Sequence, residues 1–241
     1  MKSYLNILRR RLRRQSTQEI PENLRPGDNH YRAYVGPVKD YDLISAMVIN
    51  LLTGAGLRAH HSVIDVGCGS LRIGRMLIPF LNTGNYIGVE PNKWLVMDGI
   101  RHETGRDIID MKRPHFVFAD SISDVRLRNI DFAIAQSIFS HTSTTLFAQW
   151  LSELSDALAQ TGCLFATVIT GEHDSGEEGW VYPGCVTFAP QTIATLATNA
   201  GFVLHKLDHW HPRQTWYCFA KPACDTSFIT NGIVHWTPPR S

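Results

Sequence analysis

The sequence predicts an α/β fold in which helices cover both faces of a mostly parallel sheet of seven strands. Two observations carry this prediction. From residue 62 onward, short and almost continuously apolar runs alternate with longer segments of helical periodicity, as in a parallel sheet that is buried on both faces. Only a short polar link, HWHPRQ, joins the last two apolar runs, and it predicts an antiparallel hairpin at one edge of the sheet.

Each expected element follows from its local pattern. The strands are expected at 62–67, 86–90, 115–120, 131–137, 163–170, 202–208 and 215–221. An apolar stripe at helical spacing within 41–57 predicts a helix before the sheet, and segment 142–159 has the clearest amphipathic pattern. Ser70 and Asn92 are expected to cap the helices that follow them, and Pro190 suits the first turn of another helix.

The composition is that of a globular domain with a substantial core. The chain has 241 residues, of which 44% are hydrophobic and 19% are charged. No apolar run approaches the roughly 18 residues that a membrane span needs, and the first residues lack the pattern of a secretory signal. The five cysteines are odd in number and form no CxxC pair, which favours reduced thiols in a cytoplasmic protein.

The charges are unevenly distributed along the chain. Residues 1–14 contain six of the 23 basic residues and no acidic residue, so the rest of the chain has 17 basic against 22 acidic side chains. An acidic body argues against a nucleic-acid partner. Apolar positions at helical spacing within 1–14 predict a helix that docks on a partner or lies peripherally at a membrane surface. A transit peptide and a solvated arm are the alternatives.

A glycine-rich turn follows the first strand, in the stretch VIDVGCGSLRIG at 63–74. Gly67 and Gly69 begin a dinucleotide-binding GxGxxG pattern, but Arg72 takes the place of its third glycine, so the turn alone does not identify the nucleotide. Acidic residues lie at the ends of the first three strands, namely Asp65, Glu90 and Asp120. A carboxylate beside the turn would repel a pyrophosphate, whereas one at the second strand end can accept hydrogen bonds from two ribose hydroxyls.

The motifs IDVGCG, VE, FAD and DFAIAQSIFSH, in this order, resemble those of the class I S-adenosylmethionine-dependent methyltransferases over about residues 40–222. The resemblance implies a Rossmann-like fold, S-adenosyl-L-methionine (SAM) as cofactor and methyl transfer as the reaction. It implies that the backbone of Gly67 and Gly69 approaches the methionine portion of the cofactor, which Asp65 orients. Glu90 would hold the ribose and Asp120 would meet the adenine. The expected cofactor-binding set is completed by Cys68, Pro91, Ser121, Ile122 and Gln136.

The resemblance also divides the chain into parts. With the charge pattern of the first residues, it gives the expected parts: a basic amphipathic arm at 1–20, a methyltransferase domain at 21–222 and a C-terminal tail at 223–241. The turn departs from the usual family pattern, because Leu71 stands where a third glycine would be. The turn into the next helix is therefore expected to differ, with Leu71 packing on the cofactor.

The chemistry of the acceptor is inferred from the segment after the fourth strand. No Asn/Asp-Pro-Pro-aromatic stretch or Pro-Cys pair occurs there, unlike in families that methylate adenine, glutamine or cytosine. No acid lies between Asp131 and Glu153, which disfavours the magnesium site of catechol-type enzymes. We therefore expect metal-free O-methylation of a polar small molecule or glycan. N-methylation, a macromolecular acceptor docked through the basic arm and a non-catalytic cofactor-binding protein are the alternatives.

His141, at the mouth of the fourth strand, is expected to be the general base, because the ordinary pKa of histidine suits proton transfer near neutral pH. His173 and His211 are alternative bases, and a purely structural role is the competing interpretation of His141. Loops 171–184 and 209–216 are expected to bind the acceptor. The expected contacts are Trp180, Tyr182, His211, Gln214 and Trp216. Covering residues are expected to be Tyr31, Tyr34 and Tyr41.

Overall fold

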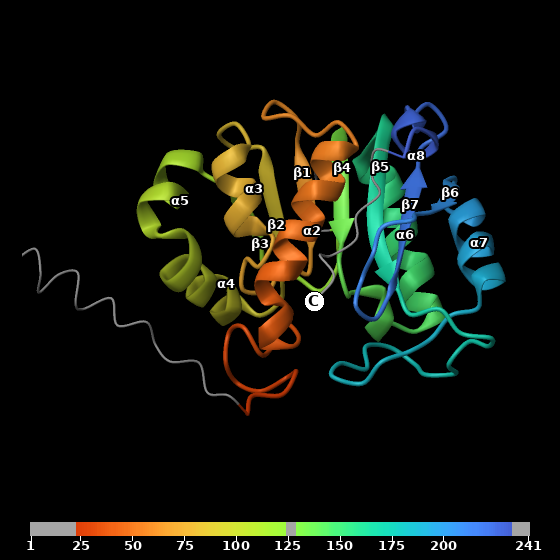
Figure 1. Cartoon of the computed structure of the whole chain (residues 1–241), viewed down its shortest axis with the longest axis horizontal. Coiled ribbons are helices and arrows are strands. Elements are labelled where there is room, and N and C mark those ends of the chain that lie inside the picture. The colour runs from red at the N-terminus through yellow and green to blue at the C-terminus, as the bar shows by residue number, and fades with distance from the viewer. Residues whose placement is uncertain (1–22, 124–128, 233–241) are drawn as a thin grey trace, which may run out of the picture.

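The computed structural model describes residues 23–123 and 129–232 (Figure 1). The basic arm expected at 1–20 lies outside these residues, as does the part of the expected tail beyond residue 232. None of the helices within the described ranges is long and apolar enough to cross a membrane.

Seven strands form one sheet in the order β3-β2-β1-β4-β5-β7-β6 (Figure 1). Neighbouring strands from β3 to β5 pair in parallel, whereas β7 pairs antiparallel with both β5 and β6. The predicted fold class is thereby confirmed, including the hairpin at the edge. The strands are β1 (Val63–Val66), β2 (Tyr86–Val89), β3 (His115–Val117), β4 (Ile130–Ala135), β5 (Leu158–Val168), β6 (Val203–Lys206) and β7 (Thr215–Ala220).

The helices of the described residues lie before, between and after these strands. They are α2 (Tyr41–Gly54), α3 (Gly74–Phe80), α4 (Lys93–Gly99), α5 (Arg106–Lys112), α6 (Thr144–Ala157), α7 (Pro190–Asn199) and α8 (Ser227–Thr230). Three short helical turns are η1 (Val38–Asp40), η2 (Ile100–Thr104) and η3 (Phe139–His141). Of these, η2 continues α4 as a π-helical turn.

Alternate side chains of the strands point to opposite faces of the sheet and form two cores. In β4, Ala133 and Ala135 belong to the core that also contains the apolar faces of α6 and α7. Phe132 and Ile134 belong to the core formed with α2 and α3. Helices thus cover both faces, which is why the central strands are mostly apolar at consecutive positions and do not alternate regularly between apolar and polar residues.

The start of α3 differs from the expectation. Ser70 does not cap this helix, which begins only at Gly74 after an N-cap at Ile73. The reason lies in the intervening residue Leu71, whose φ of 60° is left-handed and prolongs the glycine turn. Helix α5 has no counterpart among the expected elements, because its seven residues carry too short an apolar pattern.

The topology places a candidate site at one end of the sheet. Strands β2 and β3 extend to one side of β1 and β4 extends to the other, so the strand order reverses between β1 and β4. Ligands of open α/β sheets bind beyond the carboxyl ends of the strands at such a switch point. Figure 1 shows that segment 23–40 and the loop between β5 and α7 both lie at this end of the sheet.

Candidate active site

A cavity of about 690 Å³ lies at the carboxyl ends of β1, β2 and β4. This volume is within the range of pockets that hold cofactors and small molecules. Most of the residues expected in the site converge on it. They are Gly67, Gly69, Glu90, Pro91, Asp120, Ser121, Ile122, Gln136, His141, Trp180, Tyr182 and Gln214.

The glycine turn after β1 forms one wall of the cavity. Gly67 and Gly69 have φ values of +65° and +52°, a left-handed conformation that favours glycine. A Cβ atom on Gly69 would lie 2.6 Å from Cγ1 of Val35, and one on Gly67 would overlap the side chain of Ile138. Because neither position has room for a side chain, the backbone of the turn itself lines the cavity.

Leu71 continues this turn in the left-handed conformation that the missing third glycine would favour. Its side chain is fully buried and is not among the residues that line the cavity. It packs toward α3 and α4, where its Cγ lies only 3.0 Å from the position that a Cβ on Gly99 would take. Leu71 therefore faces the protein core, contrary to the expectation that it packs on the cofactor.

Glu90 joins the end of β2 to the glycine turn. Its Oε2 accepts a hydrogen bond from the backbone N–H of Gly69 at 3.1 Å. Its Oε1 accepts from the backbone N–H and the side-chain amide of Asn92, both at 2.8 Å. Burial raises the pKa of Glu90, whereas the bonds from Asn92 and Gly69 lower it. A carboxylate has about four lone-pair sites, so Glu90 can still accept a hydrogen bond from a ligand hydroxyl.

Asp65 supports the turn from behind. Its side chain is buried and its Oδ2 accepts a hydrogen bond of 2.7 Å from the hydroxyl of Tyr86. Neither Asp65 nor the buried Cys68 is among the residues that line the cavity. Burial raises the pKa of Asp65 to about 7. A group with a raised pKa in the folded state favours folding at low pH, and that contribution is lost as the pH rises toward the folded-state pKa.

Replacing Asp65 by asparagine is expected to change how stability depends on pH. The amide stays neutral, so the variant gains stability relative to the wild type as the pH rises from 5 to 8, by about 2–3 kcal/mol. Urea unfolding of both proteins without ligand at the two pH values measures this difference. If the free energies of unfolding of the wild type and Asp65→Asn differ by the same amount at pH 5 and pH 8, the raised pKa assigned to Asp65 is wrong.

The segment after β3 contributes Asp120, Ser121 and Ile122 to the cavity. The strand ends at Val117, so Asp120 lies in the following loop and not at the strand end itself. Helix α6 holds this loop, because the backbone N–H of Ile122 donates to Oε2 of Glu153 at 3.0 Å. Glu153 is thus a positioning residue that sequence reasoning did not identify.

His141 ends η3 and reaches the cavity from the β4 side. Its Nδ1 lies 2.6 Å from the carbonyl oxygen of Gly184, which can only accept, so Nδ1 carries the hydrogen. Its Nε2 has no hydrogen-bond partner in the described part of the chain and is left as an acceptor. Burial lowers the pKa of His141; the bond to Gly184 raises it and Arg213 lowers it. The ring is therefore neutral at neutral pH, with a free lone pair.

The other two histidines considered as bases lie outside the cavity lining. His173 is exposed in the loop after β5. His211 is buried, and its Nδ1 accepts the backbone N–H groups of Arg213 and Gln214, so it shapes the β6–β7 connection. Burial lowers the pKa of His211 to about 3. Trp216 is fully buried in β7 and also does not line the cavity.

Two segments meet over the cavity. The hydroxyl of Tyr182, in the β5–α7 loop, donates to the carbonyl oxygen of Tyr34, and their rings lie 5.6 Å apart. The loop is held by η3, since the N–H of Val181 donates to the carbonyl of His141 at 2.9 Å. Both tyrosines line the cavity, whereas Tyr31 and Tyr41 do not.

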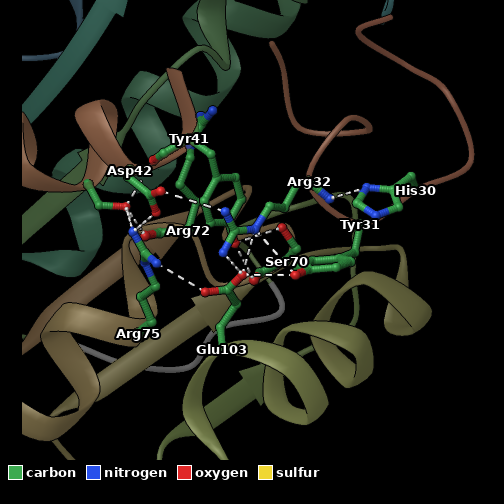
Figure 2. Close-up of polar contacts among 10 residues, drawn as sticks. His30, Tyr31, Arg32, Tyr41, Asp42, Ser70, Arg72, Arg75 and Glu103 are labelled. Atoms are coloured by element: carbon green, nitrogen blue, oxygen red, sulfur yellow. Dashed lines mark hydrogen bonds and ion pairs between the residues drawn. The ribbon is translucent and has the colours of Figure 1, made fainter. Parts of the chain in front are cut away.

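Glu103 holds the other covering segment, residues 23–40. Figure 2 shows its carboxylate between the guanidinium groups of Arg32 and Arg75, at 2.6 and 3.0 Å. The hydroxyl of Tyr31 donates to the same carboxylate at 3.0 Å, and Asp42 pairs with Arg75 at 2.6 Å. Tyr31 thus anchors the cover without lining the cavity.

Arg72 and Arg213 also line the cavity. Arg213 belongs to loop 209–216, which is expected to bind the acceptor, whereas sequence reasoning did not place Arg72 at the site. Arg72 follows the glycine turn and is 7% exposed. Its Nη1 donates to the carbonyl of Val35 at 2.9 Å, and its Nη2 donates to Oε1 of Gln136. A charged side chain within the apolar stretch LRIGRMLIPFL was the available signal, but the partners of Arg72 are remote in sequence.

Proteins similar to this chain are found by structure. No protein-family model matches the sequence, and no curated protein sequence matches it. Magnesium protoporphyrin IX methyltransferase from Synechocystis PCC 6803, solved with SAM, aligns with a TM-score of 0.58 at 13% identity, over 76% of this chain and 81% of that one. A SAM-dependent methyltransferase from Leishmania major aligns with a TM-score of 0.57 at 16% identity, over 79% and 76% of the two chains. DesVI from Streptomyces venezuelae aligns with a TM-score of 0.54 at 14% identity, over 78% and 94%. The chain therefore has the class I fold of SAM-dependent methyltransferases.

Proposed function

We propose that the protein is a SAM-dependent methyltransferase that methylates a hydroxyl group of a polar small molecule or glycan. The observation that carries this proposal is that one cavity is lined by the glycine turn, Glu90, Asp120 and His141. Fold alone does not define a reaction, so the argument rests on what these residues can do.

The cavity residues fit the cofactor. Gly67 and Gly69 leave the backbone of the turn uncovered, and Glu90 keeps a free lone pair for a ribose hydroxyl. Asp120 and the backbone beside it would bind the adenine. When bound, SAM supplies a methyl group that its positively charged sulfur activates for transfer.

The acceptor hydroxyl would give its proton to Nε2 of His141. The bond from Nδ1 to Gly184 fixes the tautomer that leaves Nε2 as the base. The rings of Trp180 and Tyr182 lie 5.6 and 4.8 Å from that of His141 and offer aromatic faces to the acceptor.

Gln214 supports a hydroxylated acceptor. Its Oε1 is buried and has no hydrogen-bond partner among the described residues. Buried polar atoms in proteins are generally paired, so a donor from a ligand would satisfy this oxygen. Because the side chain lines the cavity, a hydroxyl of the acceptor is the donor we assign to it.

Calorimetric titration with S-adenosylhomocysteine (SAH) tests the cofactor assignment. We expect micromolar binding of SAH and none of NAD. Glu90→Ala is expected to weaken SAH binding at least tenfold, because hydrogen bonds to a charged group contribute about 1.5–3 kcal/mol each. Glu177→Ala, which removes an exposed acid outside the cavity, is the matched control. Failure to bind SAH, or equal binding of NAD, would contradict the proposed function.

A further inference from the structure

The two arginines that line the cavity have no acidic partner. In the described part of the chain, neither Arg72 nor Arg213 forms an ion pair with a carboxylate. The hydrogen bonds of Arg72 go to two neutral oxygens, and its Nε is buried without a partner. Arg72 is buried, and a buried charge without an ion-pair partner is costly.

The neighbouring arginines show the contrast. Arg32 and Arg75 lie in the same region, and every acid–arginine pair in Figure 2 belongs to one of them. Glu103 and Asp42 are therefore already engaged. Burial lowers the pKa of Arg72 to about 10, so its guanidinium remains charged at neutral pH. The buried Asp65 acts on this charge electrostatically, but no carboxylate of the described residues forms an ion pair with Arg72.

The two guanidinium groups both lie close to Gly36. A Cβ atom built on this glycine would be 3.3 Å from Nη1 of Arg72 and 3.9 Å from Nη2 of Arg213. Because both distances are measured from the same Cβ position, the two nitrogens can be no farther apart than the sum of the distances, 7.2 Å. A carboxylate or phosphate whose oxygens accept charge-assisted bonds of about 2.8 Å can bridge such a gap.

Charge is divided across the cavity. The acids Glu90 and Asp120 follow β2 and β3, on one side of β1. Arg213, in the β6–β7 connection, comes from the other side, where His141 also lies. The acids suit the ribose and adenine of SAM, so the arginines are at the end where the methionine portion and the acceptor would meet.

We propose that the methyl acceptor carries an anionic group, a carboxylate or a phosphate, which binds between Arg72 and Arg213. This inference rests on the proposed function and narrows its acceptor class. SAM has one carboxylate against an ammonium and a sulfonium, so it brings a net positive charge to this end of the cavity. The single carboxylate of SAM cannot neutralise both arginines as well as the ammonium and sulfonium groups of SAM itself. An anionic acceptor would reduce this excess of positive charge.

Binding of three anions to the SAH-loaded protein tests the proposal. Inorganic phosphate, benzoate and phenyl phosphate are titrated by calorimetry, with benzamide and benzylamine as neutral and cationic counterparts of benzoate. We expect benzoate to bind at least tenfold more tightly than benzamide, and benzylamine not to bind. If none of the anions binds, or if benzamide binds as tightly as benzoate, the proposal is wrong.

Arg213→Gln is the principal variant, because this arginine is exposed and its loss does not disturb the core. It is expected to weaken benzoate binding at least fivefold and to leave benzamide binding unchanged. Arg101→Gln removes an exposed charge outside the cavity and is the matched control, expected to bind benzoate as the wild type does. Equal benzoate affinity of Arg213→Gln and Arg101→Gln would overturn the assignment.

Loading the protein with a second nucleoside shows whether the arginines bind an anionic acceptor or the carboxylate of the cofactor. 5′-Methylthioadenosine lacks the carboxylate and ammonium of SAH. If the anions bind the protein loaded with this nucleoside but not the SAH-loaded protein, the arginines belong to the cofactor carboxylate. The anionic acceptor is then refuted while the proposed function stands. A protein that binds neither nucleoside refutes the proposed function itself.

Discussion

Replacing His141 by asparagine is expected to lower kcat for methyl transfer by about 10²–10⁴-fold, the usual contribution of a general base. The asparagine amide can still donate a hydrogen bond to the carbonyl of Gly184 from near the place of Nδ1, but it has no titrating nitrogen. SAH affinity is expected to stay within twofold of wild type. The measurement is transfer of a tritiated methyl group from SAM to hydroxylated acceptors, alongside calorimetry with SAH.

The pH profile gives this prediction a second readout. A base acts in its neutral form, and burial lowers the pKa of His141 below the ordinary 6.5. The kcat/KM of the wild type is therefore expected to be flat above pH 6.5 and to fall only at lower pH, and this limb is expected to vanish in His141→Asn. His173→Asn, in the exposed loop outside the cavity, serves as the control. A His141→Asn rate close to wild type would remove this residue from proton transfer.

Replacing Gly99 by alanine is expected to destabilise the protein by about 3 kcal/mol, as overpacking of a core does. The new Cβ would overlap the carbonyl oxygen of Ser70 and would lie 3.0 Å from Cγ of Leu71. Helix α4 would therefore have to move away from the glycine turn. Helix propensity alone would favour alanine by about 1 kcal/mol, so the sign of the effect distinguishes the two contributions.

Urea unfolding measures the effect of Gly99→Ala. Gly176→Ala is the matched control, since a Cβ at this exposed loop position meets nothing within 4 Å, and its effect is expected to stay within about 0.5 kcal/mol. A midpoint for Gly99→Ala equal to or above that of the wild type would show that α4 is not packed against the turn through Leu71.

The sheet was predictable because its central strands β1, β2 and β4 are buried on both faces. This burial requires apolar residues on both faces of the strand, so it leaves continuous apolar runs, such as that of β4, that can be recognised in a single sequence. The start of α3 was not predictable, because a leucine in a left-handed conformation contradicts local propensity. Leu71 takes this conformation because its buried side chain packs over Gly74 and Gly99, and the second of these lies 28 positions away in the sequence.

The site was predictable only where its residues end strands. Gly67, Gly69 and Glu90 follow apolar runs directly, so topology alone brings them to one edge of the sheet. Arg72 reaches the cavity through contacts with Val35 and Gln136, which only the folded chain brings together. The sequence could not show whether Trp216 lines the pocket or packs in the core, because an aromatic residue just after the polar link can do either. In the structure it is fully buried.

The construction of the cover bears on how ligands enter and leave. Each half has its own anchor: Glu103 holds segment 23–40, and η3 holds the loop of Tyr182. The two halves of the cover touch through the hydrogen bond and ring contact between Tyr182 and Tyr34. Gly27 also lies close to Pro183. Parting along this seam breaks few contacts and leaves both anchors intact. We therefore expect spent cofactor to be exchanged for fresh by a local opening of this seam, on the microsecond-to-millisecond timescale typical of enzyme loops.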